Sequence, residues 1–91
     1  MTKIILEQLI WDDWNTGHIK KHKVTRAEVE EAIQRVKTHE EVKNGRFLLI
    51  GRAGSRLLSV ILSQEEGNKY YVVTARDAAR KERKHFYEED E

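Results

Sequence analysis

Cysteine and proline are both absent from this chain of 91 residues. Without cysteine the protein can form neither disulfides nor thiolate-rich zinc sites, so a reducing cytoplasm is the expected setting. No apolar run approaches the ~20 residues that a membrane-spanning helix needs. The N-terminal stretch MTKIILEQLI carries a lysine and a glutamate among its apolar residues, which argues against a signal peptide. We therefore expect a cytoplasmic protein with no membrane segment.

Length and charge predict one small, polar domain. A chain of 91 residues can bury a single modest core, so we expect one domain over residues 1–91 with an acidic tail at about 88–91. The net charge is only +1, yet cations gather in residues 18–26 and 76–85 while acids gather elsewhere. Basic patches on a near-neutral protein favour a phosphate-bearing partner, although any single run can equally be a solvated surface.

The first third of the chain indicates an extended arm and two helices. Residues 3–10 are typical of a strand or arm, and a helical pattern follows over 14–21, with Asp12 or Asp13 as its N-cap. A second helix is predicted over 26–36 behind Thr25. Glu28 lies three residues after Thr25, which is the spacing of a capping box.

The middle of the chain changes to strand-like patterns. Residues 45–54, 56–64 and 69–75 are rich in aliphatic and β-branched residues and are separated by short glycine-containing turns. Such short connections imply hairpins and an antiparallel sheet of three to four strands. With a last helix from about Asp77, the prediction is an α+β fold of two N-terminal helices, the sheet and a C-terminal helix. We expect the helices to pack on one side of the sheet.

The predicted C-terminal helix carries two stripes. Arg76, Arg80, Arg83 and Tyr87 recur at i, i+4, i+7 and i+11, whereas the neighbouring face, expected to meet the core, carries Ala75, Ala79 and Phe86. Guanidinium groups grip oxyanions in a bidentate fork. Two more arginines, Arg52 and Arg56, flank the turn between two strands. The alternative is an ordinary polar surface, stabilised by Glu/Arg pairs of ~0.2–0.5 kcal/mol each.

Two other features have both a structural and a functional interpretation. Glu82 falls on the inward face of the last helix, where a carboxylate is costly without a cation. It is either an ion-pair partner of Arg52 or Arg76 that locks helix to sheet, or a general base. His18 and His22 lie one turn apart. They could manage protons or pack against Trp11 or Trp14; with no third ligand at a fixed spacing, we expect no metal site.

The order of motifs resembles a known family. WDDWNTGHIKKHKV is similar to the W-D-x-x-N-x-x-H-I-x-x-H-G-V opening of BrnT-like toxins, which belong to bacterial type II toxin–antitoxin modules. A Gly-Arg pair before a hairpin and the segment TARDAARKERKHF resemble the close of the same family, [ST]-A-R-x-x-x-x-x-E-R-x-x-[YF]. The resemblance spans about residues 9–87.

The resemblance implies a RelE-like fold and metal-free cleavage of RNA, without a cofactor. It also implies a cognate antitoxin that wraps the toxin and adds DNA binding. The assembly expected is either a toxin–antitoxin hetero-oligomer or a homodimer of the chain. The catalytic candidates carried over by motif are His22, Arg52, Arg76, Glu82 and Arg83. The candidates for RNA contact are Arg56, Arg80, Lys20, Lys21 and Tyr87.

The chain departs from the family pattern at two positions. Lys23 stands where the family has glycine, which costs on the order of 1 kcal/mol if the backbone there is left-handed. The late tyrosine of the family aligns with Phe86, with Tyr87 adjacent. This loss, together with the acidic tail, favours an alternative: a decayed or repurposed toxin-like module that binds a protein or nucleic acid without cleaving it.

Overall fold

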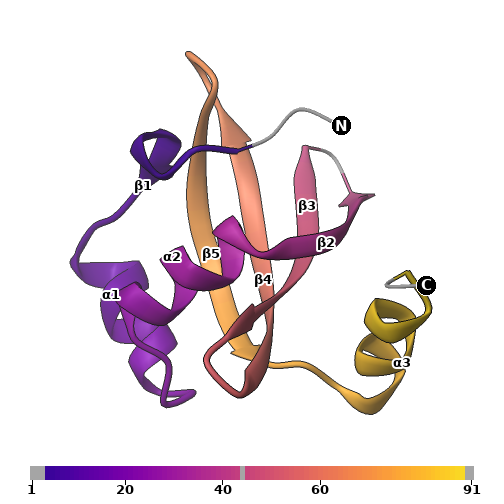
Figure 1. The fold of residues 1–91 in the computed structure, drawn as a ribbon. Coiled ribbons are helices and arrows are strands. Elements are labelled where there is room, and N and C mark those ends of the chain that lie inside the picture. Colours follow the sequence, from indigo (N-terminus) through magenta and orange to yellow (C-terminus); the bar gives the residue numbers. More distant parts are fainter. Residues whose placement is uncertain (1–3, 44, 90–91) are drawn as a thin grey trace.

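The computed structural model describes residues 4–43 and 45–89, except the side chains of 37–40, 43, 85–86 and 88–89. In these residues, three helices and a 3₁₀ turn surround a sheet (Figure 1). In chain order the elements are η1 (Leu6–Gln8), β1 (Leu9–Ile10), α1 (Asp13–Lys20), α2 (Arg26–Gln34), β2 (Val36–Lys43), β3 (Arg46–Ala53), β4 (Arg56–Glu65), β5 (Lys69–Asp77) and α3 (Arg80–Glu89). Within this part of the chain no helix is long and apolar enough to cross a membrane.

Among the described residues, the sheet has five strands in the order β1-β5-β4-β3-β2. Strands β2 to β5 form the predicted antiparallel meander, and the short β1 adds to β5 in parallel through Leu9 and Ile10. The predicted α+β class, with two N-terminal helices and one C-terminal helix, is confirmed. The sheet has more strands than predicted because the arm pairs as β1 and the polar segment 36–43 pairs as the edge strand β2. The second helix accordingly ends at Gln34, and Val36 pairs with Gly51.

Both N-terminal helices begin as their capping residues predict. Asp12 accepts a hydrogen bond from the backbone N–H of Asn15, whose side chain accepts one from the N–H of Asp12. Thr25 and Glu28 form the same reciprocal pair at the start of α2, so the predicted capping box is confirmed. Each box satisfies backbone donors that the first helical turn leaves without partners.

The helices do not all pack on one side of the sheet, and that prediction was wrong. The main core lies under α1 and α2 and is built by one face of the sheet, which includes Leu49, Val60 and Ala75. Residues of the opposite face form a smaller cluster of Ile50, Leu57 and Ala78. Helix α3 contacts this second face and lies on the far side of the sheet from α1 (Figure 1). The cause is strand alternation, since successive side chains point to opposite faces.

The last helix begins later than the sequence predicted. Arg76 and Asp77 belong to β5 and pair with Ser59 and Leu58, and α3 starts only at Arg80. The predicted arginine face is therefore divided between a strand and a helix. Of the alanines expected to face the core, Ala75 does so and Ala79 is exposed. The side chain of Phe86, the third member of that predicted stripe, lies outside the described residues, as do residues 90 and 91 of the acidic tail.

Candidate functional site

An ion pair joins α3 to the second face of the sheet. Arg76 donates two hydrogen bonds to the carboxylate of Glu82, at 2.9 and 3.1 Å. Oε1 of Glu82 also accepts from the hydroxyl of Ser59 at 2.8 Å and from the backbone N–H of Ala79 at 2.7 Å. One carboxylate thus connects two strands to the first turn of α3. The structural interpretation of Glu82, with Arg76 as its partner, is confirmed.

These contacts also fix the protonation state of Glu82. Burial by itself would raise the pKa of this carboxyl group, but the hydrogen bonds from Arg76, Ala79 and Ser59 outweigh that effect and lower the pKa from 4.5 to about 2. A carboxylate of such low basicity that already accepts several hydrogen bonds is a poor proton acceptor near neutral pH. Glu82 is therefore better suited to positioning Arg76 and α3 than to removing a proton.

A second contact between sheet and helix involves Arg52 of β3 and Tyr87 of α3. A guanidinium nitrogen of Arg52 donates to the hydroxyl oxygen of Tyr87 at 3.4 Å. This contact with Arg52, together with the positive charge of Arg83, lowers the pKa of Tyr87. Tyr87 is 46% exposed, so much of this residue is open to solvent. Tyr87, which is adjacent to Phe86, thus places a phenol beside the guanidinium groups of Arg52 and Arg83.

The register of the sheet places Arg52, Ser59 and Arg76 on the face that α3 contacts. Ser59 pairs with Ile50 on one side and Arg76 on the other, and Arg52 follows Ile50 by two residues on the same face. Two strand spacings across and two residues along separate the Cα atoms of Arg52 and Arg76 by roughly 12 Å. Extended arginine side chains can cover that distance toward one ligand. We call Arg52, Arg76, Arg83 and Tyr87, with Glu82 and Ser59 behind them, the α3 site.

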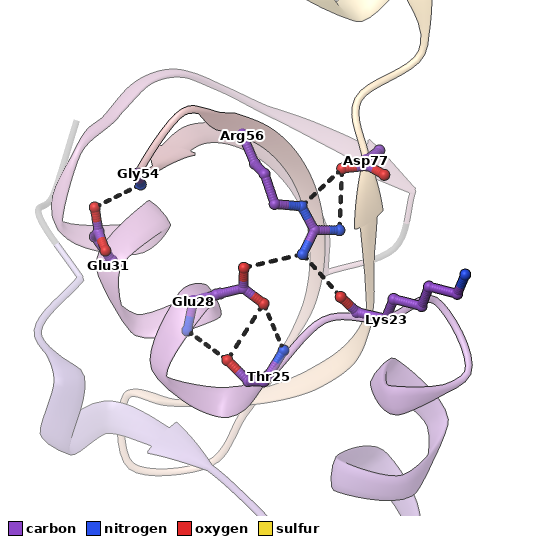
Figure 2. A network of polar contacts seen from close by, with 7 residues as sticks. All are labelled: Lys23, Thr25, Glu28, Glu31, Gly54, Arg56 and Asp77. Carbon is purple, nitrogen blue, oxygen red and sulfur yellow. Dashed lines mark hydrogen bonds and ion pairs between the residues drawn. The ribbon is translucent and has the colours of Figure 1, made fainter.

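Arg56, predicted to contact RNA, lies on the other face of the sheet. Figure 2 shows its guanidinium group between Asp77 of β5 and Glu28 of α2. It also donates to the backbone carbonyl of Lys23 at 2.8 Å. The backbone of Lys23 is left-handed, with φ of 59°, so the condition for the predicted cost of a non-glycine residue is met. This network fastens the turn between α1 and α2 to the end of the sheet.

His18 and His22 do not join the α3 site. His18 stacks on Trp14, one of the packing partners that the sequence suggested, and His22 meets the ring of His18 edge-on. His18 lies in α1 and His22 in the turn after it, on the opposite face of the sheet from α3. Lys20 and Lys21 are exposed in the same region, while Arg80 is exposed at the start of α3. The predicted RNA-contacting residues therefore occupy two separate surfaces.

Sequence reasoning did not identify Ser59 as part of the site. Its side chain is fully buried, and its hydroxyl group donates to Glu82. The available signal was a single hydroxyl residue inside the apolar run RLLSVIL, at the position directly opposite Arg76 in the ladder. Without the register, that serine has no visible partner.

A solved structure with a similar fold is the 1.1 Å crystal structure of the Brucella abortus ribonuclease toxin, BrnT. It superposes with a TM-score of 0.63 at 24% sequence identity, covering 79% of this chain and 96% of the toxin chain. The chain has a BrnT-like fold. No protein-family model matches the sequence, and no curated protein matches it. The resemblance seen in the motifs is thus confirmed for the fold.

Proposed function

We propose that this protein is a metal-independent ribonuclease toxin of a type II toxin–antitoxin module, acting on RNA in the cytoplasm. The observation that carries the proposal is the contact of Arg52 with Tyr87 beside Arg83, on the exposed surface of a BrnT-like fold. Permanent cations around an accessible phenol suit a phosphodiester. The implied partner is a cognate antitoxin that covers this surface.

Cleavage would proceed through attack of the RNA 2′-hydroxyl on the adjacent phosphorus. The bond from phosphorus to the 5′-oxygen breaks, giving a 2′,3′-cyclic phosphate and a 5′-hydroxyl. Arg52, Arg76 and Arg83 would stabilise the charge that develops on the phosphate oxygens, and removing one such donor typically costs 10²–10³-fold in rate. Glu82 would act as a positioning residue that orients Arg76.

Proton removal from the 2′-hydroxyl is best assigned to Tyr87. His22, the first candidate from sequence, follows α1 on the opposite face of the sheet, and Glu82 is held as a weakly basic carboxylate. Tyr87 lies on the correct surface, and Arg52 lowers its pKa, which favours the phenolate that accepts a proton. The leaving 5′-oxygen would take its proton from solvent water.

The test is cleavage of single-stranded RNA in the presence of EDTA. We expect Arg83→Ala and Tyr87→Phe each to reduce the rate by about 10²–10³-fold, because each removes one group from the reacting phosphate or its nucleophile. Lys69→Ala is the matched control, since it removes an exposed cation at the far end of β5. Wild-type rates in both α3 variants would refute the assignment, as would loss of activity in the Lys69 variant alone.

The pairing of Arg76 with Glu82 also supports a second candidate, a non-catalytic module that binds a protein partner. A guanidinium group whose charge is already balanced has less to offer to a phosphate. Expression without a partner separates the two candidates. A ribonuclease toxin arrests growth, and Tyr87→Phe relieves the arrest. A binding module leaves growth unchanged.

A further inference from the structure

An exposed column of aromatic rings runs along α1 and into the turn after it, on the opposite side of the sheet from the α3 site. The indole of Trp14 lies parallel to the imidazole of His18, with centroids 4.9 Å apart and planes at 6°. The ring of His22 meets His18 edge-on at 5.6 Å. Trp14 and His18 lie four residues apart on α1 and therefore above one another, and the edge-on contact of His22, in the following turn, extends them into one continuous feature. We call Trp14, His18 and His22 the ring column.

Core packing does not account for Trp14. The neighbouring Trp11 packs against the main core and carries Arg26 over its ring. Trp14, by contrast, is 58% exposed, the most exposed large apolar side chain among the described residues. A scattered exposed hydrophobic residue needs no explanation, but an indole aligned with two further rings is an organised surface.

The end of the ring column next to His22 is cationic. Lys20, Lys21 and Lys23 are exposed in the turn that ends α1. Three neighbouring carboxylates already have partners in the chain: Asp12 with Tyr71, Glu28 with Arg56 and Glu30 with Arg26. Asp13 is the one acidic residue within α1 itself. Within the part of the chain that the structure describes, the lysines of this turn therefore remain available to an anionic ligand.

We propose that the ring column is a stacking platform for bases of a single-stranded nucleic acid, whose phosphates the lysines of the turn contact. Proteins that bind single strands combine aromatic faces with a cationic track along the backbone, and both are present here. A base can continue the parallel stack on the indole face that His18 does not cover. Charge and ring geometry together favour this ligand over a protein. A nucleic acid supplies both bases for the rings and phosphates for the lysines, whereas nothing in the described part of the structure indicates a protein group that would pair with the lysines.

The network of Figure 2 links this platform to the α3 site. Arg56 binds the carbonyl of Lys23 and the carboxylate of Asp77, and the carbonyl of Asp77 accepts a hydrogen bond from Arg76. The lysine turn and the start of the α3 site thus meet around one end of the sheet. That the strand is RNA rests on the proposed function; the platform would hold one part of the substrate while another part reaches the arginines.

The test uses a short 2′-O-methyl oligoribonucleotide, which binds but cannot be cleaved. We expect it to quench tryptophan fluorescence and to bind Trp14→Ala about 5- to 150-fold more weakly than wild type. Trp14→Phe keeps an aromatic face, so it should retain most of the affinity while losing the quenching, because only Trp11 remains. Lys21→Ala should lower the salt dependence of binding, and Lys69→Ala, remote from the platform, should not.

Wild-type affinity in Trp14→Ala would overturn the inference, as would quenching that persists in Trp14→Phe. Binding of an antitoxin that depends on Trp14, together with oligonucleotide binding that does not, would assign the ring column to a protein and also overturn it. The outcome is separable from the proposed function. A chain that binds the probe through Trp14 but cleaves no RNA would refute the nuclease and leave the platform intact.

Discussion

The attachment of α3 to the sheet depends on one carboxylate, which makes Glu82→Gln an informative perturbation. The amide keeps the shape of the side chain but loses the charge that Arg76 pairs with. It also weakens the acceptor used by Ser59 and by the N–H of Ala79. We expect the variant to be less stable near neutral pH and less sensitive to acid than wild type.

The magnitude follows from the pKa of Glu82. A fall from 4.5 to about 2 corresponds to roughly 3 kcal/mol at about 1.4 kcal/mol per unit. The side chain of Arg76 is 41% exposed, so solvent screens the pair. We therefore expect about 1.5–2 kcal/mol. Because the folded pKa is the lower one, this stabilisation is complete above the unfolded pKa of 4.5 and is lost as pH falls from there toward about 2.

Urea denaturation followed by circular dichroism at several pH values between 7 and 2.5 measures this effect. The free energy of unfolding of wild type should fall steadily below about pH 4.5. Glu82→Gln should have a lower free energy of unfolding at pH 7, and that free energy should fall less as the pH is lowered. Glu65→Gln is the matched control, since that carboxylate is exposed on β4. Parallel curves for wild type and Glu82→Gln, or equal stability at pH 7, would refute this account of how α3 is held.

Three further substitutions test the other side of the sheet by the same denaturation assay. In Gly51→Ala the added methyl group would overlap the carbonyl oxygen of Ala32, so we expect the free energy of unfolding to fall by roughly 3 kcal/mol. A fall of less than about 1 kcal/mol would contradict that close packing. Lys23→Gly removes left-handed strain and should gain about 0.5–1 kcal/mol, whereas no gain would show that the strain is absent. Asn15→Ala should lower the free energy of unfolding by about 2 kcal/mol, because it removes both the capping contact and a part-buried hydrogen bond to the carbonyl of Ile10. A cost below about 0.5 kcal/mol would contradict that role.

Local signals in the sequence predicted most of the elements. Capping residues marked both N-terminal helices, and glycine turns marked the hairpins, because each depends on interactions within a few residues. The edge strand β2 was missed since its sequence, VKTHEEVK, lacks an apolar face. An edge strand gains its order from backbone pairing with β3, which depends on residues distant in sequence.

The candidate site was predictable in most of its residues but not in its geometry. Arg52, Arg76, Arg83 and Tyr87 were all identified, and the structure brings them to one surface. The helical spacing that first connected Arg76 with Arg83 was nevertheless wrong, since Arg76 belongs to β5. A boundary error of three residues changed which face each side chain occupies. The prediction grouped Arg56 and His22 with the site although both lie on the other side of the sheet. It did so because nothing in the sequence shows which face of the sheet a residue lies on.

The end of β5 determines which of its side chains point to each face of the sheet. A bulge at Val73 sits between the pairs Leu62–Val72 and Ile61–Thr74, and it shifts the following residues by one position. Ala75 therefore faces the main core, while Arg76 and Asp77 point to opposite faces. A one-residue slip would exchange them. Asp77 would then lie beside the carboxylate of Glu82, and Arg76 beside the guanidinium group of Arg56. Like charges would meet on both faces, so the ion pairs that hold α3 and the lysine turn also fix the register of the strand between them.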